Sequence, residues 1–277
     1  MIELNIDNDT CIRCGRCVAV CPVQILTQEE KKGDVAVMNL QNCIDCGQCV
    51  AICPTDSVLH SSYPKEKVHA IRKELLPSPD ALMEIMRRRR SNRAFSQKQV
   101  PMEYLDQILE AADLAPTAKN DRPLKFTLVT RPEVLEAVHK ACIEVCDRIA
   151  NQLSGSESKD DRKRGLYLKA LSYKYKSGYE VILRYAKALI VIHGDEESAA
   201  ADANLAYQNA SLMAEALDVA HFYTGYVRMI SLMDTEGTIK KTMGIEGRIL
   251  AGMALGMPQY KFDKYIDRKK QDVSRLI

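Results

Sequence analysis

Two copies of one cysteine spacing occupy the first 53 residues of this 277-residue chain, and they contain eight of its ten cysteines. Each copy reads C-x-x-C-x-x-C-x-x-x-C-P, with three closely spaced thiols and a fourth just before proline. The members are Cys11, Cys14, Cys17 and Cys21 in the first copy, and Cys43, Cys46, Cys49 and Cys53 in the second. This spacing holds pairs of 4Fe–4S clusters, and the fourth cysteine of each run binds the other cluster. The sequence therefore predicts one cluster on Cys11, Cys14, Cys17 and Cys53, and a second on Cys43, Cys46, Cys49 and Cys21.

Zinc and disulfides are the other common uses of clustered cysteines. Zinc sites take two C-x-x-C pairs, or cysteine with histidine, rather than runs of three plus one. Disulfide frameworks are typical of secreted chains, and residues 1–10 show neither the basic nor the apolar part of a secretion signal. Gly15 and Gly47 lie at matching places between the second and third cysteines. They predict tight bends, because glycine adopts left-handed backbone conformations without steric cost.

Charge and hydropathy exclude several kinds of partner. The net charge is +2, which does not indicate binding of nucleic acid or of a membrane surface. The longest strictly apolar stretch runs from residue 188 to residue 192, far short of a membrane span. We therefore expect a cytoplasmic protein that binds neither nucleic acid nor membrane.

The chain is expected to divide after the cysteine-rich part. We predict an iron–sulfur domain at residues 1–60, a linker at 61–77 and a second domain at 78–277. Ser78 is a suitable N-cap residue, Pro79 suits the first helical position and Asp80 complements the helix dipole. These residues predict a helix that reaches Arg89 or Arg90.

The second domain combines predicted helices and strands, which indicates an α+β class. The run at 188–192 is continuously apolar, as in a strand covered on both faces. The expected strands are 126–130, 188–192, 222–227 and 249–255, and the expected helices include 101–112, 199–220 and 235–243. Gly244 is expected to end the last helix in a left-handed conformation.

Three segments of this domain resemble the nitroreductases, which are dimeric FMN-dependent flavoproteins. They are Arg89-Arg90-Ser91-Asn92-Arg93-Ala94-Phe95, then Ala115-Pro116-Thr117-Ala118-Lys119-Asn120-Asp121-Arg122-Pro123, then Leu255-Gly256-Met257-Pro258. Their order and spacing resemble the family over about residues 80–277. With the N-terminal cysteines, the chain is similar to nitroreductases fused to a bacterial ferredoxin-type domain. The resemblance implies a small two-cluster ferredoxin-like domain, followed by an FMN-binding domain with a mixed sheet flanked by helices, and a homodimer.

The resemblance also assigns flavin-binding residues. Arg89 and Ser91 would bind the FMN phosphate, since arginine presents a planar pair of donors and serine a short hydroxyl. The remaining expected contacts are Arg90 and Arg93 near the phosphate, ribityl chain or ring edge, Pro116, Thr117 and Asn120 against the ring, Thr224 and Gly225 near flavin N5, and Lys264 and Arg268 near the phosphate. The chain departs from the family pattern at Thr117 and Arg122, where serine and glutamine are usual. A solvated helix face or a nucleic-acid patch is the alternative use of Arg87–Arg90.

Other polar and reactive residues carry weaker signals. The segment 151–178 and its tyrosines fit either a lid over the flavin or a surface helix. Cys142 and Cys146 are expected to be small buried residues. His193 is expected to have a structural role at a strand end, and the spacing of His221 supports no role.

The pattern predicts an oxidoreductase that receives electrons singly. The sequence has no G-x-G-x-x-G motif after a predicted strand, so it gives no sign of a dinucleotide-binding unit. We expect an external donor such as ferredoxin, transfer through two clusters to FMN, and reduction of a small acceptor: a nitroaromatic, quinone, activated alkene or halogenated aromatic. No catalytic side chain is required, because the flavin supplies the chemistry. The alternative is an electron-transfer protein whose FMN relays electrons to a protein partner.

Overall fold

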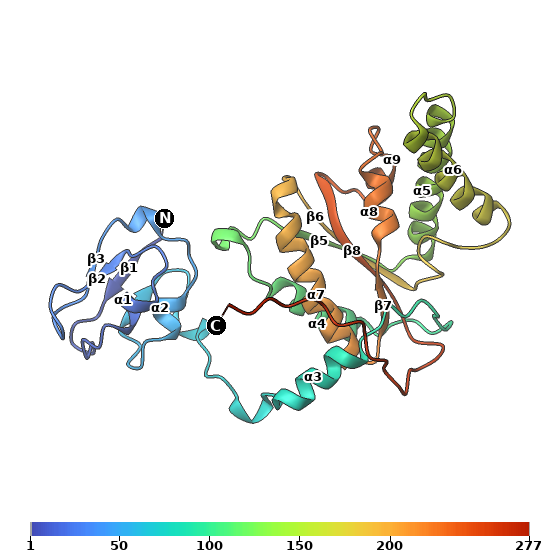
Figure 1. Cartoon of the computed structure of the whole chain (residues 1–277). Helices are drawn as coiled ribbons and strands as arrows, with labels where there is room; N and C mark the ends of the chain where they lie inside the picture. The colour runs from blue at the N-terminus through green and yellow to red at the C-terminus, as the bar shows by residue number, and fades with distance from the viewer. Residues whose placement is uncertain (1, 277) are drawn as a thin grey trace. The chain divides into compact units, whose positions relative to one another are not determined.

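The computed structural model describes residues 2–276, which form two compact units (Figure 1). The first unit comprises the residues up to Leu76 together with Ala118–Arg122. The second comprises Pro77–Thr117 and the chain from Pro123 onward. Most of the segment expected as a linker thus groups with the first unit. The Ser61 amide donates to the Glu3 carbonyl at 2.9 Å, so this segment extends the first unit's hydrogen bonding.

The first unit is built from two small antiparallel sheets and two short helices. Its elements are β1 (Leu4–Ile6), α1 (Arg16–Val20), β2 (Leu26–Thr27), β3 (Ala36–Val37), α2 (Gln48–Ala51) and β4 (Val58–His60). Strand β1 pairs with β4, and β2 pairs with β3. The two cysteine motifs therefore surround a small core that includes Leu4, Ile25, Leu26, Val50 and Val58.

The second unit contains the longer helices and a larger sheet. Its elements are α3 (Pro79–Arg88), α4 (Met102–Asp113), β5 (Lys125–Val129), α5 (Pro132–Leu153), α6 (Lys159–Lys176), β6 (Ala188–Gly194), α7 (Ala200–Ala216), β7 (Ala220–Tyr223), α8 (Gly225–Ser231), α9 (Thr238–Lys241) and β8 (Arg248–Gly256). Short 3-10 turns lie at Leu40–Asn42, Lys65–Lys67, Lys73–Leu75, Ala118–Asn120 and Glu197–Ala199. The predicted start of α3 is confirmed: Pro79 is its first residue, and Ser78 Oγ accepts the Ala81 N–H at 3.1 Å.

The sheet of the second unit lies between two helical layers, in the order β5-β6-β8-β7. Every residue of β6 is buried. Leu189 and Val191 pack in the same core as α5 and α6, whereas Ile190 and Ile192 pack with α4 and α7. Successive strand residues point to opposite faces, so the continuous apolar run serves both cores and the predicted buried strand is confirmed.

The expected α+β class is confirmed, but two expected details are wrong. All three pairings of this sheet are antiparallel, not mixed. The two helices α5 and α6 between β5 and β6 return the chain to the same end of the sheet, which makes these neighbours antiparallel. The strand expected at 222–227 ends at Tyr223, and α8 begins at Gly225. Its apolar residues Val227 and Ile230 are buried on a helix face instead.

Helix α7 ends earlier than its alanine-rich sequence predicts. Its last residue is Ala216, and Asp218 adopts a left-handed φ of 55°. That conformation turns the chain into β7 two residues later. The left-handed conformation expected at Gly244 is confirmed, with a φ of 63°.

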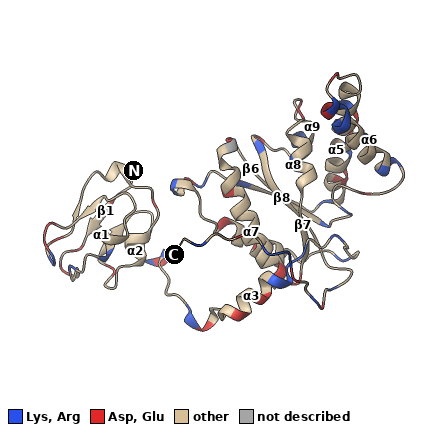
Figure 2. Ribbon diagram, in the orientation of Figure 1, with Lys and Arg blue, Asp and Glu red and all other residues tan. Residues whose placement is uncertain are grey.

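Charged residues are distributed over both units with both signs represented. Figure 2 shows acidic and basic residues mixed along α3. Within residues 2–276, no helix combines the length and the apolar character needed to span a bilayer.

Candidate functional site

The cysteines of the first unit surround two separate cavities. One cavity is lined by Cys11, Cys14, Cys17 and Cys53. The other is lined by Cys21, Cys43, Cys46 and Cys49. The structure thus brings together each of the two sets that the spacing predicts, with the fourth cysteine exchanged between the copies. Each set thus lines a space, while no group of three or more metal-ligating side chains within residues 2–276 is placed to hold a single metal ion. A four-iron cluster takes one thiolate per iron, so its ligands surround a volume.

The backbone of each copy turns sharply before its third cysteine. Gly15 precedes α1 with a φ of 70°, and Gly47 precedes α2 with a φ of 67°. These left-handed conformations confirm the expectation for both glycines. A Cβ at Gly47 would also be crowded, since it would lie 3.1 Å from the ring of Tyr63.

Burial makes the thiols of Cys17 and Cys49 costly to ionise. Burial, with smaller contributions from the nearby Cys46, Cys43 and Cys21, raises the pKa of Cys49 to about 11. Burial acts in the same direction at Cys53, but hydrogen bonds from Thr55, Ser57 and Val58 outweigh it and lower that pKa. Iron would supply the positive charge that four adjacent thiolates need.

Hydrogen-bond donors reach the sulfur atoms of both sets. The Ser57 amide lies 3.3 Å from Cys53 Sγ, and the Thr55 hydroxyl lies 3.7 Å from the same atom. His60 Nε2 lies 3.7 Å from Cys43 Sγ. Sequence reasoning did not single out these three donors, since no spacing rule connects them with the cysteines.

Asn120 belongs to the first unit and bonds to the loop between Cys43 and Cys46. Its Nδ2 donates to the carbonyl of Ile44 at 3.1 Å and to that of Asp45 at 2.8 Å. The Tyr63 hydroxyl donates to the same Asp45 carbonyl. The amide that the resemblance assigns to the flavin ring is therefore engaged by a cysteine-bearing loop, and its flavin contact stays a prediction.

The first and third nitroreductase-like segments lie side by side in the second unit. Phe95 forms a β-bridge with Pro258, and the Ser96 amide donates to the Met257 carbonyl at 2.8 Å. A Cβ on Gly256 would lie 2.6 Å from the ring of Phe95. The close approach of these segments thus requires glycine at 256.

The arginines that follow α3 lie close to aromatic and polar side chains of the sheet and α7. The Arg93 guanidinium lies 5.2 Å from the centre of the Phe222 ring. Burial raises the pKa of Tyr207, while the positive charges of Arg89 and Arg93 act to lower it. Arg90 Nη1 donates to two backbone carbonyls, whereas its buried Nη2 has no hydrogen-bond partner within residues 2–276. A buried guanidinium nitrogen without an acceptor fits a site that takes an anionic group such as the FMN phosphate.

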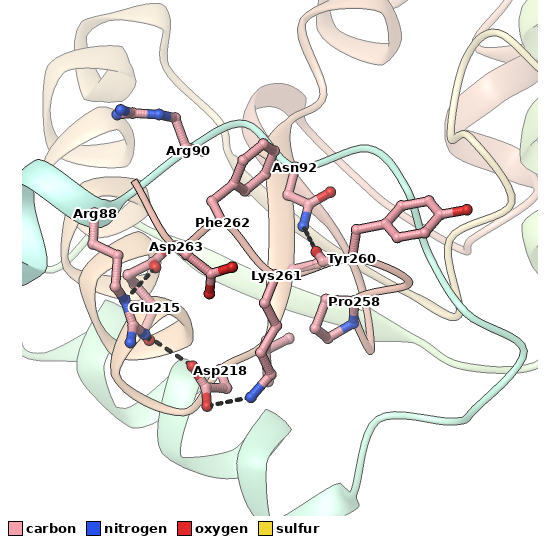
Figure 3. Close-up of a pocket in the computed structure, with 12 residues that line it drawn as sticks. Arg88, Arg90, Asn92, Glu215, Asp218, Pro258, Tyr260, Lys261, Phe262 and Asp263 are labelled. Atoms are coloured by element: carbon pink, nitrogen blue, oxygen red, sulfur yellow. Dashed lines mark hydrogen bonds and ion pairs between the residues drawn. The ribbon is translucent and has the colours of Figure 1, made fainter. Parts of the chain in front are cut away.

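Arg88 is exposed and belongs to an ion-pair cluster. Its guanidinium lies 2.8 Å from a Glu215 carboxylate oxygen and 3.0 Å from one of Asp218. Lys261 lies 2.9 Å from the other Asp218 oxygen. Figure 3 shows this cluster in a pocket of about 190 Å³, with the Arg90 guanidinium directed away from it. The carboxylates neutralise Arg88, so Arg90, whose guanidinium lies outside this cluster, is the better candidate for binding an anion.

The remaining predicted flavin residues differ in exposure. Thr224 is buried, and its amide donates to the Gly252 carbonyl at 2.9 Å. Its hydroxyl occupies the space beside Gly252, where a Cβ would lie 2.5 Å away. Gly225, Ser91 and Pro116 are exposed, and Thr117 is half-buried. Lys264 and Arg268 are exposed in a C-terminal segment without helix or strand among its described residues.

The other histidines and cysteines have structural surroundings. His193 contacts the Thr127 hydroxyl at 3.0 Å and the Glu246 carbonyl at 3.2 Å. His221 contacts the Ser211 hydroxyl at 2.8 Å and the Val219 carbonyl at 3.0 Å, and burial lowers its pKa. Cys142 and Cys146 are fully buried, as expected.

Much of the segment 151–178 forms α6, which packs on α5. Leu168 and Leu171 of this helix are buried in the core shared with α5. Tyr173 and Tyr179 are exposed. The Tyr167 and Tyr226 hydroxyls lie 2.8 Å apart, and burial with this bond raises the pKa of Tyr167 to about 12.

Comparison with known proteins finds one family match in each of two separate parts of the sequence. Residues 86–257 match the model of the nitroreductase family, and residues 3–54 match that of a 4Fe-4S dicluster domain. The fold and these matches define an oxidoreductase that uses FMN and iron–sulfur chemistry. The chain belongs to the nitroreductase family, since the match spans more than half of its residues.

Individual relatives are distant. The chain is 32% identical to iodotyrosine deiodinase 1 from Homo sapiens over 81 residues, which are 29% of this chain and 26% of that protein. The chain thus matches about a quarter of the length of this curated relative. It is similar to the structure of a nitroreductase with bound FMN from Desulfitobacterium hafniense, with 18% identity, a TM-score of 0.54, and coverage of 70% of this chain and 98% of that one. An FMN-dependent nitroreductase from Clostridium difficile gives 17% identity, a TM-score of 0.54, and coverage of 72% and 100%.

Proposed function

We propose that this protein takes single electrons from an external donor such as a reduced ferredoxin and uses them to reduce a small organic acceptor. Two 4Fe–4S clusters would receive the electrons, one on Cys11, Cys14, Cys17 and Cys53, the other on Cys43, Cys46, Cys49 and Cys21. The observation that carries this proposal is the pair of cavities, each lined by one of these sets. A domain with two such cysteine-lined cavities is suited to the transfer of single electrons.

The second unit would hold FMN beside the segment that follows α3. Arg89 and Ser91 would bind the phosphate, and Arg90 would offer its unpartnered Nη2 to the same group. Arg93 lies over the Phe222 ring, which holds its side chain by a cation–π contact while leaving N–H donors for a ligand. When bound, FMN supplies the exchange between single electrons and electron pairs.

Family membership supports a choice of acceptors to test and a proposed assembly. A nitroaromatic or a quinone is the first class of acceptor to test, and the deiodinase relative adds halogenated phenols to the panel. We infer a homodimer from the family, with the flavin domain forming the dimer contact.

Cofactor content after anaerobic purification tests the proposal directly. About eight iron atoms, about eight acid-labile sulfides and about one FMN per chain are expected. Reduced ferredoxin and NADPH are then compared as donors with each acceptor, and faster turnover with ferredoxin is expected. Full iron without FMN, even after incubation with added FMN, would exclude the flavin part. Four irons or fewer after reconstitution would exclude the two-cluster part.

A further inference from the structure

His60 lies among the cysteines of the second cavity, at the end of β4. Its residue is 5% exposed, and it lines the cavity together with Cys21, Cys43, Cys46 and Cys49. Nε2 lies 3.7 Å from Cys43 Sγ, and Nδ1 lies 3.2 Å from the Ser62 amide nitrogen. Both ring nitrogens are therefore in contact with a specific partner.

The Ser62 amide determines which ring nitrogen carries the proton. A backbone N–H is always a donor, so Nδ1 must accept it with its lone pair. In the neutral ring the proton then resides on Nε2. His60 thus presents an N–H group to the Cys43 sulfur rather than a lone pair.

Asp45 is the only competing acceptor that the described contacts place near this N–H. Its Oδ1 also lies 3.7 Å from His60 Nε2. This distance is beyond the ordinary range of about 2.7–3.2 Å for N–H···O bonds. Oδ1 is buried and without a hydrogen-bond partner within residues 2–276. Sulfur is larger than oxygen, so the same separation is a bonding distance to Cys43 but not to Asp45.

The first cysteine copy has no equivalent of this histidine. His60 follows Cys43 by 17 residues, and Gln28 holds the same place after Cys11. Gln28 Nε2 donates instead to the Arg13 carbonyl at 3.1 Å and the Gly33 carbonyl at 2.6 Å. In the first cavity the side-chain donor to sulfur is Thr55, which contacts Cys53.

We propose that His60 donates a hydrogen bond to Cys43 and thereby raises the reduction potential of the cluster held by Cys21, Cys43, Cys46 and Cys49, independently of the other cluster. This inference rests on the proposed two-cluster function. Reduction of a bound cluster by the external donor would add one electron, and its negative charge would be shared by the ligating sulfurs. A donor aimed at one of these sulfurs stabilises the reduced cluster more than the oxidised one. His60 acts through Cys43 and is a positioning residue.

The test is His60→Leu in the full chain, which removes the donor and keeps an apolar side chain of useful volume. Redox titration followed by electron paramagnetic resonance gives the two potentials separately. One of the two reduction potentials is expected to fall in His60→Leu. At a fixed potential, the ratio of reduced to oxidised cluster should drop about tenfold, which corresponds to a shift of about 59 mV for a one-electron couple. Gln28→Leu is the matched control. In that variant, the potential that His60→Leu lowers is expected to keep its wild-type value. Thr55→Val is expected to lower the other potential.

A measurement on the unchanged sequence covers the case in which His60→Leu does not fold. Protein labelled with ¹⁵N-histidine is examined by pulsed electron paramagnetic resonance in the reduced state. A histidine nitrogen coupled to one cluster is expected, and its absence overturns the inference. Equal potentials in wild type and His60→Leu, at full iron content, overturn it while the two-cluster function stands. A wild-type chain that binds only one cluster overturns both.

Discussion

Replacing Asn120 with alanine tests which of its two assigned partners it holds. The structure joins its side-chain amide to the carbonyls of Ile44 and Asp45, in the loop between Cys43 and Cys46. The nitroreductase-like segment instead assigns Asn120 to the flavin ring. The two assignments predict the loss of different cofactors from the same variant.

The magnitude follows from the two hydrogen bonds that alanine removes. Each contributes about 0.5–1.5 kcal/mol in net terms. The Asp45 carbonyl keeps its bond from the Tyr63 hydroxyl, so only the Ile44 carbonyl loses its described side-chain donor. We therefore expect the loop to be destabilised by about 1.5 kcal/mol, which raises the population of its open form roughly tenfold.

Iron release to a strong chelator under anaerobic conditions measures this change. About half of the iron is expected to leave roughly ten times faster than in wild type, because only one cluster depends on this loop. Lys119→Ala is the matched control: its side chain is exposed, and both phases should keep their wild-type rates. Loss of FMN with unchanged iron release would refute the structural reasoning and support the flavin contact.

Two further predictions concern the second unit. Arg89→Ala combined with Ser91→Ala should lose FMN on gel filtration and keep its full iron content; stoichiometric FMN in the double variant would contradict the phosphate assignment. Asp234→Asn should lower the free energy of unfolding by about 2–3 kcal/mol, since a buried carboxylate that accepts the Ile239 amide at 2.8 Å becomes neutral. Burial raises the pKa of Asp234, but hydrogen bonds led by the Ile239 amide outweigh it and hold that pKa below its usual 3.8. The carboxylate therefore stabilises the fold fully above about pH 4 and less as the pH falls, so thermal unfolding of wild type and variant should converge in acid. Glu236→Gln, at an exposed carboxylate, should change stability by less than about 0.5 kcal/mol; an equal loss in both variants would refute the role of burial.

Local patterns predicted much of this fold. The buried strand β6 was visible because a run of apolar residues has no polar face to expose. The start of α3 was visible because Ser78 and Pro79 satisfy the helix terminus through neighbours in sequence. The two cysteine sets were visible for the same reason, since cluster ligands follow a fixed spacing.

Features that depend on distant segments were not predicted. Apolar residues after Phe222 suit a strand or a helix equally well, and the buried position of Thr224 beside Gly252 marks the point where the strand ends. The bond between Asn120 and the carbonyl of Ile44 joins residues 76 positions apart. No local pattern indicates such a pair.

The proposed flavin residues were predicted in part. The sequence indicated that Arg89–Phe95 and Leu255–Pro258 both contribute, and the bridge between Phe95 and Pro258 brings the two segments together. The contact of Arg93 with the Phe222 ring was not foreseen, because Phe222 was assigned only to a strand. Side-chain partners across a sheet depend on packing that spacing alone does not encode.

The exchange of Cys21 and Cys53 between the two cavities makes the cysteine copies inseparable. A chain shortened to either copy would keep only three of the four thiols that line one cavity. The fourth cysteine of that copy would have lost the three thiols with which it lines the other cavity. The motif is repeated in the sequence, yet neither copy can be removed or transplanted without breaking both cysteine sets. Loss of either whole copy would therefore break both cysteine sets at once.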